Sequence, residues 1–180
     1  MIHGVLETTN MGATRFAERI FDCVSDVDLD NGVIGHMEEL AEGYTHIYKF
    51  VPGVKAGEPV LIVNAPAWSE DESRIECQRK DTFYIPAGTP FRAFVMKVTD
   101  EFAVNAACAT PETQESMAVG KFVSVDEATG KLVVADEAAE DAVFVGEIMR
   151  KRVQGGKIVT PLRSYGRVHD MFTIKVKALG

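Results

Sequence analysis

The sequence lacks the features that mark several classes of protein. Its three cysteines, Cys23, Cys77 and Cys108, form no C-x-x-C pair and no set with metal-ligand spacing. No apolar run approaches the roughly 18 residues of a membrane span, and no charged start is followed by the apolar stretch of a signal peptide. We therefore expect free thiols in a protein that is made and kept in a cytoplasm, with no membrane partner.

Positive charge is also scarce. The 180 residues carry 19 Lys and Arg against 27 Asp and Glu, which gives a net charge of −8. A nucleic-acid-binding protein needs a basic face to attract phosphates, and the densest basic runs here, at 150–152 and 175–177, are short. We predict no nucleic-acid partner. The length fits one globular domain, or one domain with a small lobe.

Motifs of catalysis and phosphate binding are absent, since no H-E-x-x-H, G-x-S-x-G, P-loop or G-x-G-x-x-G occurs. Asp26, Asp28 and Asp30 alternate as at the start of a calcium-binding EF-hand loop. The pattern then fails, because its sixth position is Asn31 instead of glycine and its twelfth is Met37 instead of a bidentate glutamate. We predict solvated carboxylates at a turn, no metal, no cofactor and no enzymatic activity.

Short strand-like runs separated by Gly and Pro turns dominate the rest of the sequence. The predicted extended runs are 33–40, 45–51, 59–64, 74–85, 91–98, 102–107, 120–125, 131–135, 142–152, 157–162 and 168–178. Residues 59–64 are almost continuously apolar, which predicts a strand covered on both faces. Residues 168–178 alternate, which predicts a sheet with one wet face.

Two hairpins are predicted from these runs. One joins 120–125 to 131–135 through a five-residue loop that ends in Gly130, and the other joins 91–98 to 102–107. Strands at roughly ten-residue spacing predict a mainly β fold, with an antiparallel β-barrel or sandwich-like domain and little helix. The helix candidates are 38–42 and the segment 14–24, for which a strand is the alternative.

The N-terminal segment differs from the rest in composition. Residues 1–13 are polar or small and show no apolar face, which predicts an extended arm that is loose unless something holds it. We therefore divide the chain into an N-terminal arm, 1–20, and a β-rich domain, 21–180. If this domain has two lobes, we expect them to separate near 110–118.

The order of several short motifs resembles a known family. The motifs are the arm running into RFAE at 15–18, DNG at 30–32, YKF at 48–50, the run 58–66, the turn within 83–91, DEFAV at 100–104, GKFV at 120–123, GKL at 130–132, FVGEI at 144–148 and MFTIKV at 171–176. Over most of the chain this order resembles capsid decoration, or head-stabilising, proteins from the head-gene clusters of tailed bacteriophages and prophages. The resemblance implies a β-rich protein, without catalytic residues, that binds the outside of the capsid.

The resemblance also implies a partner and a location. The partner is the major capsid protein, on which a homo-oligomer, with a trimer favoured, sits at the virion surface after synthesis in the host bacterial cytoplasm. An arm that adds a strand to a sheet edge on the capsid binds through main-chain hydrogen bonds. On this hypothesis the contact residues are Thr8, Thr9, Asn10, Met11 and Phe16.

Two other functions are compatible with the same pattern. A phage tail or connector component is also β-rich, but it self-assembles into rings or tubes instead of binding a preformed shell. A carbohydrate-binding β module is the other alternative, and it would hold a sugar through Trp68 and Tyr84. Aromatic residues near strands more often pack in a core. Core packing is therefore the alternative interpretation of Trp68 and Tyr84.

Overall fold

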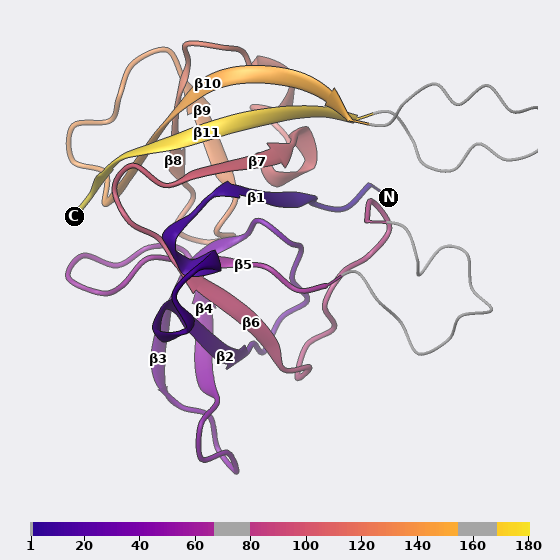
Figure 1. Cartoon of the computed structure of the whole chain (residues 1–180), viewed down its shortest axis with the longest axis vertical. Coiled ribbons are helices and arrows are strands. Elements are labelled where there is room, and N and C mark those ends of the chain that lie inside the picture. Colours follow the sequence, from indigo (N-terminus) through magenta and orange to yellow (C-terminus); the bar gives the residue numbers. More distant parts are fainter. Residues whose placement is uncertain (1, 67–79, 155–168) are drawn as a thin grey trace, which may run out of the picture.

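The computed structural model describes residues 2–66, 80–154 and 169–180. Two β-structures make up this part of the chain, and they lie on opposite sides of a shared core (Figure 1). One is a six-stranded sheet, here called sheet A, and the other is a closed five-stranded barrel. The prediction of a mainly β fold with a β-barrel or sandwich-like domain and little helix is confirmed, and the described structure contains a barrel. The predicted run 157–162, the first part of 74–85, and Trp68 lie outside the described residues.

The barrel is built from one continuous stretch of the chain. Its strands are β2 (Ile20–Val24), β3 (Ile34–Leu40), β4 (Tyr48–Pro52), β5 (Leu61–Val63) and β6 (Phe91–Val95), closed in the order β2-β4-β3-β5-β6. Its neighbouring strands are antiparallel except β2 and β4, which are parallel. The helix candidate 38–42 is wrong, because residues 38–40 continue β3.

Sheet A contains the N-terminal strand and the described strands that follow the barrel. These are β1 (Leu6–Asn10), β7 (Glu101–Asn105), β8 (Phe122–Val125), β9 (Leu132–Ala135), β10 (Phe144–Gln154) and β11 (His169–Leu179), in the antiparallel order β1-β7-β11-β10-β8-β9. Helical structure in the described residues consists of the one-turn 3-10 helices η1 (Gly12–Thr14), η2 (Ala17–Arg19), η4 (Ala106–Cys108) and η5 (Gln114–Ser116). No helix among the described residues is long and apolar enough to cross a membrane.

Strand β5 lies between the barrel interior and the core that the barrel shares with sheet A. Leu61, Ile62 and Val63 are all fully buried, which confirms the prediction of a strand covered on both faces. Because side chains alternate along a strand, Leu61 and Val63 point into the barrel interior, where they join Phe50. Ile62 points the other way, into the core between the barrel and sheet A, where it joins Phe102.

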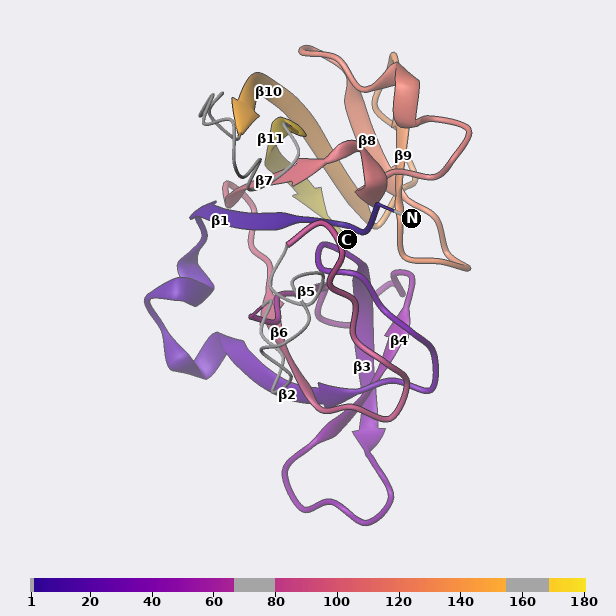
Figure 2. The same cartoon turned by 90° about the vertical axis from the view of Figure 1, so that its right-hand side faces the viewer.

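The N-terminal segment is part of this structure. Strand β1 pairs with β7, and Leu6 lies opposite Val104. Val5, Leu6, Met11 and Ala13 are buried, although their irregular spacing forms no visible apolar face in the sequence. Figures 1 and 2 show β1 running along the boundary between sheet A and the barrel. Tertiary pairing therefore holds the predicted arm.

Two buried polar side chains fix the arm in place. The Asn105 side chain accepts a hydrogen bond from the Val5 N–H at 2.9 Å and donates one to the His3 carbonyl at 3.0 Å. The Asp100 carboxylate accepts the Gly12 N–H at 3.0 Å. Burial of an unpaired amide group costs about 1–3 kcal/mol, so these bonds favour this one position of the segment.

One of the two predicted hairpins is confirmed and the other is wrong. Strands β8 and β9 pair as predicted across the loop 126–130. Strands β6 and β7 do not pair, because β6 lies between β2 and β5 in the barrel, whereas β7 lies between β1 and β11 in sheet A. The turn near Thr99, which has a φ of 80°, carries the chain from one structure to the other. Residues 110–118 lie within the sheet A part, between η4 and β8.

Candidate functional site

The five residues predicted to contact a partner have different environments. Thr9 and Asn10 are exposed and Thr8 is half-buried, whereas Met11 is only 2% exposed and packs in the shared core. Phe16 lies between η1 and η2 and is 51% exposed. We call Thr8, Thr9, Asn10 and Phe16 the arm surface. Met11 holds the arm surface against the shared core through its buried side chain.

Arg19 covers part of the exposed Phe16 ring. Its guanidinium carbon lies 5.3 Å from the centre of that ring, within the range of a cation–π contact. The sequence analysis did not identify Arg19, although the i, i+3 spacing from Phe16 places the two on one face of a helical turn. Aromatic and arginine side chains are the types most enriched in the centres of protein interfaces.

Strand β1 is at the end of the sheet A order, and no described strand pairs with its second edge. The Asn105 N–H bonds to the Val5 carbonyl at 3.2 Å. Main-chain groups alternate in direction along an antiparallel strand, so the N–H and C=O of Thr8 point away from β7. Within the described residues, the outward-pointing main-chain groups of Thr8 therefore have no strand partner.

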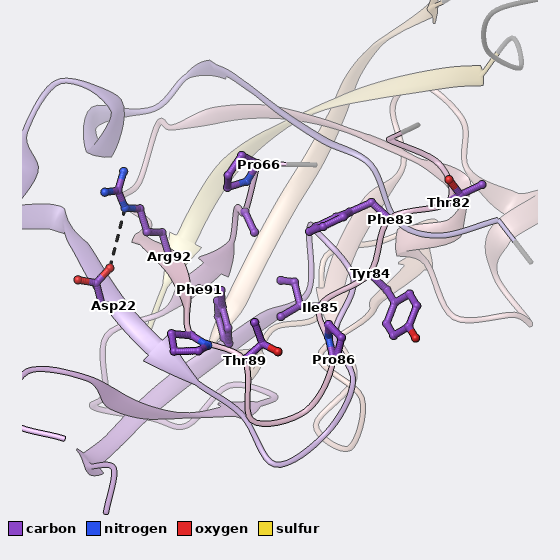
Figure 3. A pocket seen from close by; sticks show the side chains of 12 residues that line it. Asp22, Pro66, Thr82, Phe83, Tyr84, Ile85, Pro86, Thr89, Phe91 and Arg92 are labelled. Atoms are coloured by element: carbon purple, nitrogen blue, oxygen red, sulfur yellow. Dashed lines mark ion pairs between the residues drawn. The ribbon is translucent and has the colours of Figure 1, made fainter. Parts of the chain in front are cut away.

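A cavity of about 830 Å³ opens on the barrel side of the molecule (Figure 3). Its walls are mainly apolar and include Pro66, Pro86, Pro90, Phe83, Tyr84 and Phe91. At one side, Arg92 Nε lies 3.9 Å from Asp22 Oδ1. Small-molecule sites are apolar clefts of this size with a few polar groups. Residues 67–79, which connect Pro66 to Lys80, lie outside the described residues.

Tyr84 at the rim of this cavity is held by the N-terminal segment. The His3 ring stacks on Tyr84 with 5.2 Å between ring centres and an angle of 19° between planes. His3 Nδ1 also lies 2.7 Å from Asp30 Oδ1. The sequence analysis did not identify His3, because the pairing of a residue near the start of the chain with the loop before β3 leaves no local signal.

The alternating aspartates 26, 28 and 30 do not converge. Asp26 pairs with Lys49 at 2.8 Å and holds the pKa of that ammonium above its usual value through a hydrogen bond. Asp28 accepts the Ala87 N–H at 2.9 Å, and Asp30 pairs with His3. Each carboxylate thus has its own partner. Within the described ranges, no group of three or more His, Cys, Asp or Glu residues is arranged to hold a metal ion.

The two described cysteines are buried free thiols. Burial raises the pKa of Cys23 and of Cys108 to about 12, and the nearby carboxylates of Asp22 and Asp30, respectively, add to the effect. The thiolate is the nucleophilic form of cysteine. Both groups therefore remain protonated at neutral pH and have the character of core residues. Cys77 lies outside the described residues.

The basic run 150–152 lies at the far end of β10. Arg150 lies 3.4 Å from Glu101, Arg152 pairs with Glu7, and Lys151 lies 2.7 Å from Asp170. Arg150 and Arg152 thereby reach across sheet A toward the acidic residues of β7 and β1. Each basic residue remains about half exposed.

The arm surface, the cavity and the charged end of β10 are the features of the described structure with binding chemistry. The sequence analysis named the arm residues, Tyr84 and the basic run 150–152, but it did not identify the cavity or the ion pairs at the end of β10. Searches of protein-family models, curated proteins and solved structures gave no match to this chain.

Proposed function

We propose that the protein is a virion structural protein that binds the outside of a phage capsid through the arm surface and stabilises the shell. The proposed partner is the major capsid protein. The observation that carries the proposal is that Phe16, a half-exposed aromatic with Arg19 over its ring, is held on a segment anchored by the buried Met11 and Ala13.

Rigidity of the arm favours this function. A disordered arm loses conformational entropy when it binds, and that loss weakens the complex. Here the Asp100–Gly12 and Asn105–Val5 hydrogen bonds already hold the segment. The arm surface is therefore ordered before contact. Since a shell offers many identical sites, we propose that the bound form is a homo-oligomer, with a trimer favoured.

Co-sedimentation with undecorated capsids of the encoding phage tests the proposal. The wild-type protein is expected to pellet with the capsids and to saturate at a fixed ratio to the major capsid protein. Phe16→Ala is expected to weaken binding by about tenfold or more, as for a residue at an interface centre. Tyr44→Ala is the matched control, because Tyr44 is an exposed aromatic on the β3–β4 connection, outside the arm.

Thr8→Pro separates strand addition from side-chain docking. Proline removes the Thr8 N–H, which points away from β7, and leaves the β1–β7 hydrogen bonds in place. Loss of capsid binding by a folded Thr8→Pro variant supports addition of a strand to β1. Capsids that fail to pellet the wild-type protein, or that bind Phe16→Ala and wild type equally, rule out the arm surface.

The cavity favours a second candidate function, carbohydrate binding. Tyr84 is exposed at the rim and its ring is fixed by His3, as a sugar-stacking platform requires. A glycan array with the purified protein tests this alternative. Binding that is lost in Tyr84→Ala but kept in Tyr44→Ala supports it, and an array without hits excludes it for the glycans displayed.

A further inference from the structure

Strand β10 connects an acidic loop to a run of three basic residues. The loop before β10, residues 136–141, has the sequence DEAAED. The basic run 150–152 lies near the C-terminal end of β10. We call residues 136–141 the acidic loop, and we call the basic run together with its neighbours Met149 and Val153 the basic end. The eight residues 142–149 lie between the acidic loop and the basic run and, at about 3.3 Å per residue of extended chain, separate them by roughly 25–30 Å. In Figure 1 the arrow of β10 runs from the acidic-loop side of sheet A to the opposite side.

We infer that copies of this chain associate head to tail, with the basic end of one copy on the acidic loop of the next. This inference names the contact surfaces of the homo-oligomer in the proposed function and rests on that part of it. The partner is thus a second copy, identified by charge complementarity between two ends of the same molecule. One copy cannot join its own ends, because β10 holds them apart.

The acidic loop is available for such a contact. All six of its residues are exposed. Asp136 pairs with Lys121 at 2.5 Å, whereas Glu137, Glu140 and Asp141 make no ion pair with any described residue. Three uncompensated carboxylates within five residues repel one another, and a basic surface placed against them relieves that repulsion.

The basic end is ordered by its internal ion pairs and still has donors to offer. Arg150 and Arg152 bind Glu101 and Glu7, which restricts their side chains before any partner arrives. A guanidinium has five N–H donors, and one carboxylate uses at most two of them in a bidentate pair. The exposed remainder of each arginine can therefore bind a carboxylate of the acidic loop.

The basic end also carries exposed apolar side chains. Met149 is 43% exposed and Val153 is 63% exposed, the highest value among the large hydrophobic residues described as exposed. Beyond residue 148, no described strand pairs with the second edge of β10. The basic end can therefore combine apolar contact through Met149 and Val153 with hydrogen bonds from its half-exposed basic side chains.

Head-to-tail contacts use two different surfaces, so they close into a ring or continue as a filament. A ring of three gives the trimer of the proposed function. Larger rings give the self-assembling tail or connector component. The number of copies in the closed ring therefore distinguishes a decoration trimer from a tail or connector ring.

Sedimentation velocity of the purified protein, without capsids, tests the inference. Wild type is expected to form a closed oligomer near 50 mM NaCl, with about tenfold weaker association near 500 mM because salt screens exposed charges. A Glu137→Lys/Glu140→Lys/Asp141→Lys variant, with its changes confined to an exposed loop, is expected to remain monomeric. An Arg150→Gln/Lys151→Gln/Arg152→Gln variant is expected to do the same.

Mixing the two variants gives the sharpest test. The loop variant keeps its basic end and the arginine variant keeps its acidic loop, so an equimolar mixture is expected to form a one-to-one complex and nothing larger. Glu38→Lys/Glu39→Lys/Glu42→Lys is the matched control, since it makes the same charge change at exposed positions on β3 and its turn. It is expected to associate like wild type.

Three outcomes overturn the inference: a wild-type protein that stays monomeric at low salt, a loop variant that associates like wild type, or a control variant that fails as the loop variant does. Each is separate from capsid binding through Phe16. If the protein is a monomer that still pellets with capsids, the proposal of the arm surface stands and the head-to-tail contact is ruled out. If the protein is an oligomer that does not pellet with capsids, the head-to-tail contact stands and capsid binding through the arm surface is ruled out.

Discussion

The side-chain oxygen of Asn105 accepts a hydrogen bond from the Val5 N–H at 2.9 Å, across a hundred residues of sequence. This bond and the Asn105 donation to His3 join the start of the chain to the end of β7. Asn105 is 2% exposed, so water cannot replace it as a partner. The arm belongs to the fold because of such contacts.

Asn105→Ala is expected to lower the free energy of unfolding by about 1–3 kcal/mol, because the Val5 N–H is left buried without an acceptor. Urea denaturation measures the change. Asn10→Ala is the control, since Asn10 is exposed and its loss is expected to cost less than about 0.5 kcal/mol. Equal effects for the two variants contradict the role of Asn105.

Met11 and Phe16 lie five residues apart and are expected to behave in opposite ways. Met11→Ala creates a cavity in the shared core and is expected to cost about 3 kcal/mol of stability. Phe16→Ala removes a half-exposed ring and is expected to change stability by less than about 1 kcal/mol. Thermal or urea unfolding distinguishes them. A loose arm predicts no effect from either change, so an unaltered Met11→Ala protein refutes the packed arm.

Gly130 lies where the β8–β9 hairpin meets the barrel. Its carbonyl accepts the Ile34 N–H at 2.8 Å, its φ is +66°, and a Cβ there would lie 2.2 Å from the Ile34 oxygen. Gly120 has a φ of +87° but no atom within 4 Å of such a Cβ. Both glycines thus adopt the left-handed region, and only one is also in close contact.

Alanine at Gly120 is expected to cost about 1–2 kcal/mol from backbone strain alone. Alanine at Gly130 is expected to cost more than about 3 kcal/mol, because the clash separates the hairpin from the barrel. Chemical denaturation of both variants gives the difference. Similar losses indicate that the close approach at Gly130 is relaxed at little cost.

The Cys108 thiol predicts a pH dependence of stability. The ordinary pKa of a cysteine thiol is 9.0, and burial raises the pKa of Cys108 to about 12. Between these pH values the unfolded chain has lost the proton that the folded chain keeps. Stability is therefore unaffected below about pH 9 and falls as pH rises toward about 12, by up to about 1.4 kcal/mol per pH unit.

Comparison of Cys77→Ser with Cys77→Ser/Cys108→Ala isolates this contribution from other groups that titrate at high pH. Urea unfolding at several pH values above 8 is expected to give a shallower decline for the variant without Cys108. Parallel declines mean that the thiol is not the cause. The same background allows alkylation of the buried thiols to be followed, and the reaction is expected only on unfolding.

The sequence determined the class of the fold and several of its strands. Apolar runs such as 59–64 and the turn residues of the 126–130 loop act locally, because alternation and left-handed glycines fix a strand or a turn without reference to distant residues. For the same reason β8 and β9, which are neighbours in sequence, were predicted as a pair. The exposure of Thr9 and Asn10 also agrees with their polar character.

The tertiary structure decided which strands are neighbours and which groups meet. The alternation of 91–98 and 102–107 specifies a face for each residue but no partner, so only the shared core places β6 in the barrel and β7 in sheet A. The burial of Met11, the Asn105–Val5 bond and the cavity at Tyr84 likewise depend on segments far apart in the chain. A local pattern contains no information on such contacts, because they arise when separate apolar faces pack together.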